Sequence, residues 1–215
     1  MKKMIFMAAM LMAAVGMQAQ EESKSQWAVK PMVGATYSRV FDSNVSNSYR
    51  LGVAAGAEVL FQPKTLGGFS VSSGILYATQ KSAISDVVNG SVKYKFEYLN
   101  VPLLLNYEVV KGLKVKAGVQ LGFRLNAKYD IGEWELLGYA GDVNAKDMTK
   151  PLYFSIPVGL SYNFPFGLVA DFRYNIGVTN VLRSNPTIDG IDYQTTGSRG
   201  HHSTFMLTLG YQIKL

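Results

Sequence analysis

Eight segments of this chain alternate apolar and polar residues, and every glycine inside them falls on the polar phase. A β-strand sends successive side chains to opposite faces, so each segment would carry its large apolar residues on one face and its small and polar residues on the other. The clearest segment reads LKVKAGVQLGFRLN, from Leu113 to Asn126. Alternation repeated this often predicts an all-β chain with two chemically different faces.

The spacing of these segments predicts a single barrel. We expect strands at residues 27–39, 50–61, 68–80, 94–109, 113–129, 152–164, 168–180 and 203–215. The connections alternate between short ones (62–67, 110–112, 165–167) and longer polar ones (41–49, 81–93, 130–150, 181–202). This pattern is typical of outer-membrane barrels, with short turns in the periplasm and long loops outside the cell. An even strand number then places both mature termini in the periplasm.

The first 19 residues are typical of a secretory signal peptide. Lys2 and Lys3 precede an apolar run over residues 4–15 that is too short to span a bilayer as a helix, and small residues follow it. We expect cleavage after Ala19, which leaves 20–26 as a short periplasmic segment and 27–215 as the barrel domain. The chain has no cysteine, so neither a lipid-modified cysteine nor a disulfide is expected.

Alternation alone does not say which face is inside, because a water-soluble eight-stranded barrel would place its apolar face inward. The glycines favour the membrane arrangement, since small residues on the polar phase suit the cramped interior of eight strands. The apolar phase also carries aromatic residues near the strand ends, as the girdles of membrane barrels do. These are Trp27, Tyr37, Phe61, Phe69, Tyr77, Tyr107, Tyr162, Phe164 and Tyr211. We therefore predict an eight-stranded antiparallel up-and-down transmembrane β-barrel, bounded by outer-membrane lipid.

Three prolines lie within the expected strands, at positions 31, 102 and 157. Proline has no backbone N–H to donate to a ladder, and a closed barrel has no free edge on which to place it. Pro31, Pro102 and Pro157 therefore predict bulges or strand ends.

The inward phase carries most of the candidate functional chemistry. We expect a lumen charge network of Arg50, Glu58, Lys114, Lys116, Arg124, Asp171 and Arg173, with Lys30, Lys214 and Glu108 on the same phase. One interpretation is a narrow passage that favours anions. The other, which we favour, is a plug of paired charges, because buried charges are costly unless paired and eight strands leave little bore. The plug predicts weak conductance or none.

Two further patterns are candidate chemical sites. His201 and Ser203 share a strand face at a loop edge, which would suit a base and nucleophile of a lipid A deacylase, but no third group orients the histidine. The loop 130–150 carries Asp130, Glu133, Glu135, Asp142 and Asp147 without the spacing of a calcium loop. We expect no catalytic residues, metal or cofactor, and the scattered basic residues give no nucleic-acid footprint.

That loop also carries Trp134, Leu136, Leu137 and Tyr139. Apolar residues exposed on a loop either cap the barrel mouth or meet a partner, and capping is the interpretation we favour.

Three stretches carry a more specific likeness. YLNVPLLLNY (98–107), RYNIGVTNV (173–181) and LGYQIKL (209–215) resemble the PorT-like, porin-family outer-membrane barrels of Bacteroidetes-type bacteria. The resemblance implies an outer-membrane barrel with a non-enzymatic structural, accessory or transport-related role, with secretion-system components as partners. The barrel assembly machinery is a further expected partner. The alternatives are a small-solute channel, an adhesin acting through its long loops, and a lipid A-modifying enzyme.

Overall fold

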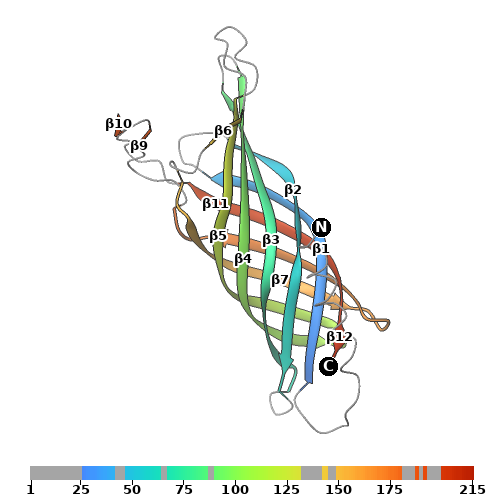
Figure 1. The fold of residues 1–215 in the computed structure, drawn as a ribbon. Coiled ribbons are helices and arrows are strands. Elements are labelled where there is room, and N and C mark those ends of the chain that lie inside the picture. Colours follow the sequence, from blue (N-terminus) through green and yellow to red (C-terminus); the bar gives the residue numbers. More distant parts are fainter. Residues whose placement is uncertain are drawn as a thin grey trace, which may run out of the picture.

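Eight long antiparallel strands close into a ring in the computed structural model (Figure 1). The structure describes residues 26–41, 47–63, 67–86, 90–131, 142–144, 149–180, 187–188, 191–192 and 200–215. The signal peptide expected at 1–19, and nearly all of the segment expected at 20–26, lie outside these residues. In the described part of the chain no helix is long and apolar enough to cross a membrane.

The ring follows the order of the chain. Its strands are β1 (Gln26–Phe41), β2 (Asn47–Gln62), β3 (Phe69–Asp86), β4 (Gly90–Val110), β5 (Leu113–Ile131), β7 (Leu152–Asn163), β8 (Leu168–Gly177) and β11 (His201–Tyr211), which β12 (Ile213–Lys214) continues. Each pairs antiparallel with its neighbours, and β1 pairs with both β2 and β11 to close the ring. The predicted eight-stranded up-and-down architecture is confirmed.

Three short strands lie outside this ring. Strand β6 (Asp142–Asn144) pairs with β5, while β9 (Thr187–Ile188) and β10 (Ile191–Asp192) pair only with each other. We call the end of the barrel at the turns β2–β3, β4–β5 and β7–β8 the short-turn end, and the opposite end the long-loop end.

The strands β3, β4 and β5 rise above the rest of the ring at the long-loop end (Figure 1). The segment 81–93 was expected to be a loop, but β3 and β4 remain paired from Lys81–Lys95 to Asp86–Gly90. Backbone hydrogen bonds sustain this extension without a continuous row of large apolar side chains. The apolar pattern of the sequence therefore ended before the strands did.

None of the three prolines bulges or ends its own strand, although β11 ends at Tyr211, which the register sets opposite Pro31. Pro31, Pro102 and Pro157 lie within β1, β4 and β7, each paired in regular register with one neighbouring strand. Pairing with the other neighbour is interrupted around each proline, without a change of register. A missing N–H affects the ladder on one side only, so the ring tolerates these residues. The register shifts lie elsewhere, near Arg50–Ala54, Glu97–Tyr98 and Glu108–Val110.

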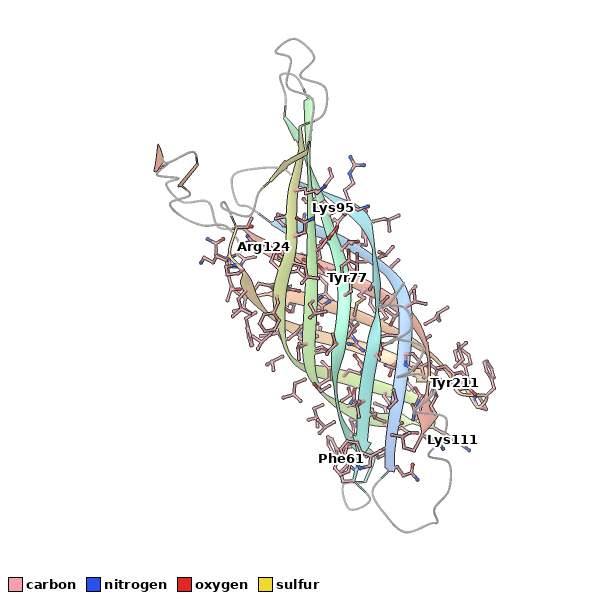
Figure 2. The ribbon with its side chains drawn as sticks, in the orientation of Figure 1. Phe61, Tyr77, Lys95, Lys111, Arg124 and Tyr211 are labelled. Atoms are coloured by element: carbon pink, nitrogen blue, oxygen red, sulfur yellow. The ribbon has the colours of Figure 1, made fainter. Side chains whose placement is uncertain are left out.

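The outer surface of the ring is apolar and the interior is polar. Val33 and Leu51 are 63% and 66% exposed, whereas Arg173 and Asn106 are completely buried. Figure 2 shows side chains projecting from the outside of the ring, with Phe61 and Tyr211 towards the short-turn end and Lys95 and Arg124 towards the long-loop end. An apolar surface on every strand is the arrangement of a barrel in lipid and the reverse of a soluble one.

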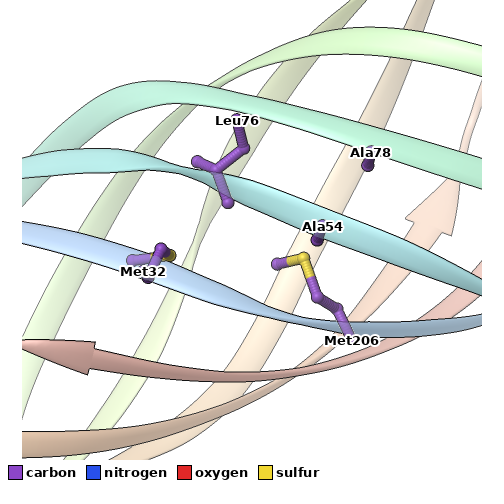
Figure 3. Close-up of a cluster of buried hydrophobic side chains, with 5 residues drawn as sticks. All are labelled: Met32, Ala54, Leu76, Ala78 and Met206. Atoms are coloured by element: carbon purple, nitrogen blue, oxygen red, sulfur yellow. The ribbon is translucent and has the colours of Figure 1, made fainter. Parts of the chain in front are cut away.

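Buried side chains fill the interior in three layers. In the middle is an apolar cluster of Met32, Ala54, Leu76, Ala78 and Met206 (Figure 3). Ionic side chains lie on its short-turn side, and aromatic and amide side chains lie on its long-loop side. The mixed interior therefore has a small apolar core between two polar layers.

Glycine on β2 allows strands on either side of it to interact. Gly52 lies between β1 and β3, and an added Cβ would come within 2.5 Å of the Thr36 hydroxyl oxygen and 2.3 Å of the Thr79 carbonyl oxygen. In the space that Gly52 leaves, the Thr36 hydroxyl donates a hydrogen bond of 2.5 Å to that carbonyl. The glycine on the inward phase of β2 thus permits a hydrogen bond between β1 and β3.

Candidate functional site: the barrel lumen

Five charged side chains meet in the short-turn half of the lumen, and we call them the charge cluster: Lys30, Glu58, Lys116, Asp171 and Arg173. They come from β1, β2, β5 and β8. Strands β1 and β5 stand opposite each other in the ring, four steps apart in either direction. The cluster therefore draws together side chains from facing walls of the barrel.

Asp171 is the centre of the charge cluster. Its Oδ2 lies 2.9 Å from Lys30 Nζ and 2.5 Å from Lys116 Nζ, and its Oδ1 lies 2.6 Å from Arg173 Nε. One carboxylate thus bonds cations from three strands. Because Lys30 and Lys116 reach it from opposite walls, their side chains cross the full width of the bore.

Glu58 is the second acidic member. Its Oε2 lies 3.0 Å from Lys30 Nζ and 3.6 Å from Lys116 Nζ, and its Oε1 lies 2.5 Å from Arg173 Nη1. All five side chains are nine-tenths or more buried. Buried charges persist only with close partners of opposite sign, and these geometries supply them.

An aromatic layer closes the lumen on the long-loop side, formed by Phe96, Tyr98, Tyr153 and His202. The Tyr98 and Tyr153 rings meet edge to face with centroids 4.6 Å apart, and the His202 ring lies 5.3 Å from both. The Tyr98 hydroxyl and His202 Nε2 share a hydrogen bond of 2.9 Å. These groups come from β4, β7 and β11, so this layer also spans the lumen.

The Tyr153 ring takes its position from a glycine. It lies over Gly122 of β5, where an added Cβ would fall only 1.8 Å from the ring. Its hydroxyl donates to Asn100 Oδ1 at 2.7 Å and accepts from the amide groups of Gln80 and Gln120 at 3.1 and 3.2 Å. The aromatic layer is therefore held by neutral hydrogen bonds and ring packing.

The predicted charge network is only partly assembled. Glu58, Lys116, Asp171 and Arg173 come together, with Lys30 as the fifth member. Arg50 is exposed at the long-loop end, where the β2 bulge interrupts the register. Arg124 is half-buried near the same end and donates to the Thr149 carbonyl oxygen at 2.7 Å and to the Thr149 hydroxyl. Counting alternation places a residue on a face, but not at a height within the barrel.

Lys114 is the remaining predicted member, and it lines a small cavity below the charge cluster. The cavity has a volume of about 20 Å³, which is room for one or two water molecules. Lys30, Lys116, Ser161, Asn163 and Gln212 are among its other lining residues. Lys114 thus adjoins the charge cluster through this small space.

The His201–Ser203 pair is not arranged as a base and nucleophile. The Ser203 hydroxyl forms hydrogen bonds with the hydroxyls of Tyr49 and Tyr174, at 3.1 and 3.0 Å. The neighbouring His202 is 3% exposed and belongs to the aromatic layer. It lies on the inward phase of β11, and the neutral groups around it fill the lumen at this height.

The predicted girdle residues separate into two levels. Seven are near the short-turn end: Trp27, Phe61, Phe69, Tyr107, Tyr162, Phe164 and Tyr211. Several of these pack in pairs, with centroids 4.6 Å apart for Trp27–Phe61 and for Phe69–Tyr107. Tyr37 and Tyr77 lie further towards the long-loop end of β1 and β3.

Sequence reasoning missed aromatic residues both outside and inside the ring. Outside the ring, Tyr49 stacks on Tyr37 with centroids 4.9 Å apart, and Tyr174 stacks on Phe205 at 4.6 Å. Inside it, Tyr98 and Tyr153 occupy the inward phase. The signal for the inner pair was present, since both are aromatic residues at positions where the alternation expects small or polar ones.

The acidic loop lies mainly outside the described residues. This applies to Glu133, Glu135 and Asp147, and to the apolar residues Trp134, Leu136, Leu137 and Tyr139. Within the described part of the chain, no three metal-ligating side chains form a group that could hold an ion.

Comparison with known proteins identifies the family. A model of the outer membrane protein β-barrel domain matches residues 18–183. This chain belongs to that family. Together with the apolar outer surface, membership places the barrel in the outer membrane.

Solved structures share the fold at low sequence identity. OprG from Pseudomonas aeruginosa matches with a TM-score of 0.51 and 9% identity, over 89% of this chain and 97% of that one. Neisserial surface protein A matches with a TM-score of 0.50 and 12% identity, over 88% and 99%. No curated protein matches significantly. At these identities the structures establish a shared barrel fold alone.

Proposed function

We propose that this protein is an outer-membrane barrel with a closed lumen and a non-enzymatic, structural or accessory role. The observation that carries the proposal is Asp171, on which cations from opposite walls converge. The aromatic layer adds a second obstruction. A barrel whose lumen is filled at both ends would act through its outer surface, rim and loops, because it offers no pore.

A finer role follows from the PorT-like resemblance. The motifs at 98–107, 173–181 and 209–215 support membership of that group, and with it an accessory role beside secretion-system components. The barrel assembly machinery would insert the chain. Affinity purification of the tagged protein from crosslinked native membranes should recover secretion components. Recovery of the assembly machinery alone would count against the secretion role.

The aromatic residues support a definite position in the bilayer. Trp27 and Tyr37 are ten residues apart on β1, about 33 Å along the strand. At a tilt of roughly 40°, this is about 25 Å along the barrel axis, the height of the apolar band of such barrels. In this proposal the short-turn end and both mature termini face the periplasm, and the long loops face outwards.

Planar-bilayer recording tests the closed lumen. We expect the reconstituted wild-type protein to show no stable openings. The matched variant combines Asp171→Ala with Tyr98→Ala and Tyr153→Ala, which removes the centre of one obstruction and two rings of the other. Its folding would be checked by the mobility shift that heating causes in gels. Stable, large, anion-selective openings of the wild type would overturn the proposal and favour the channel.

A further inference from the structure

Lys114 is buried in the lumen and forms no ion pair with any of the described residues. Lys114 is 5% exposed and lines the cavity at the short-turn side of the charge cluster. Among the described residues, it takes part in no ion pair or side-chain hydrogen bond. Its partner across the β4–β5 ladder is Glu108, whose Oε1 accepts a hydrogen bond from the Gly112 backbone N–H at 3.0 Å. The Glu108 carboxylate therefore bonds the turn and forms no ion pair with Lys114, although its negative charge still acts on the ammonium group.

The cavity adjoins an excess of positive charge. Four buried cations, Lys30, Lys114, Lys116 and Arg173, accompany two buried carboxylates, Glu58 and Asp171. Both carboxylates are already shared among the other three cations. A buried charge without a partner is costly, so an anion beside Lys114 would relieve the imbalance.

The cavity is small. Its volume of about 20 Å³ has room for one small anion such as a halide. Besides Lys114, the lysines 30 and 116 line it, and Ser161 provides a hydroxyl donor. Leu60, Asn163 and Gln212 line the side of the cavity that faces the short-turn end. An anion would therefore have the shorter path to the cavity from that end of the barrel.

We propose that this cavity binds one chloride ion, held by Lys114 together with Lys30 and Lys116. The ion completes the charge balance of the closed lumen and stabilises the folded barrel. A site for a bound anion is distinct from a conducting path, because the charge cluster and the layers above it block further passage.

Anomalous diffraction locates the ion directly. Crystals of the mature protein grown in sodium bromide should show one anomalous peak between the three lysine ammonium groups. The peak should be lost in Lys114→Met and kept in Lys111→Met, which removes an exposed lysine of the adjacent turn. A wild-type protein with no peak there would overturn the proposal. A peak that persists in Lys114→Met would overturn the assignment to this lysine.

Thermal unfolding in detergent micelles gives an independent measurement. Chloride would be exchanged for gluconate at constant ionic strength, because gluconate is a much larger anion than chloride. Above the dissociation constant, each tenfold rise in chloride should raise the Tm of the wild type and of Lys111→Met by about 3 °C. Lys114→Met should melt at the same temperature in both salts. Coincident melting of the wild type in chloride and gluconate would contradict the proposal.

Discussion

The two halves of the lumen are closed by different chemistry. The short-turn half relies on five charges from four strands, in which each carboxylate serves several cations at once. The long-loop half relies on packed rings and neutral hydrogen bonds around Tyr153 and His202. We expect the loss of one charge to disturb the whole first arrangement, whereas the second should lose contacts one at a time. One narrow bore can thus be filled by a cooperative network in one half and by nearly independent contacts in the other.

Removing Asp171 should have the largest effect, because three buried cations lose a shared partner. We expect Asp171→Ala to lower the free energy of unfolding by about 3–5 kcal/mol, as for other broken buried ion pairs. Urea unfolding in lipid vesicles, followed by tryptophan fluorescence, measures this loss.

The control is the more exposed Lys95–Glu97 pair, whose charged atoms are 2.9 Å apart. Glu97→Ala should cost less than about 1 kcal/mol. Equal losses in the two variants would mean that the charge cluster contributes no more than a surface ion pair, and the contrast between the halves would fail.

Tyr153→Phe should have an intermediate effect, because it keeps the ring over Gly122 and removes only the hydroxyl. Asn100 Oδ1 then loses the donor at 2.7 Å, and the two glutamine amides lose their acceptor. An unsatisfied buried group costs about 1–3 kcal/mol. The same urea titration measures the loss, which should not change between low and high salt. A salt-dependent loss would show that ionic groups also hold the aromatic layer.

The sequence predicted the ring and its polar interior, because alternation and glycine placement report directly which face each side chain occupies. It also placed Glu58 and Asp171 on the inward phase. It did not predict that Arg50 and Arg124 would stand apart from them, since height along the barrel depends on register and on the β2 bulge. The aromatic layer was missed because Tyr98 and Tyr153 were not recognised as filling space over Gly122 and beside His202.

The smallest effect is expected on the outside of the ring, at Ser203. Its hydroxyl is covered on the outer face by Tyr49 and Tyr174, which are half-buried and bond it. Those tyrosine hydroxyls can find water or lipid headgroups instead, so Ser203→Ala should cost about 0.5–1 kcal/mol, less than Tyr153→Phe inside. A loss as large as that of Tyr153→Phe would mean that burial in the lumen adds nothing to a neutral hydrogen bond.

The same variant separates a packing role from the enzyme alternative. Mass spectrometry of lipid A from membranes that carry the wild type or Ser203→Ala should give identical acyl-chain patterns, because the serine hydroxyl is held by tyrosines instead of a histidine. Deacylated lipid A that depends on Ser203 would show a nucleophile at this rim. The hydrogen bonds of Ser203 outside the ring would then serve catalysis. Only the polar contacts inside the ring would serve to close the lumen.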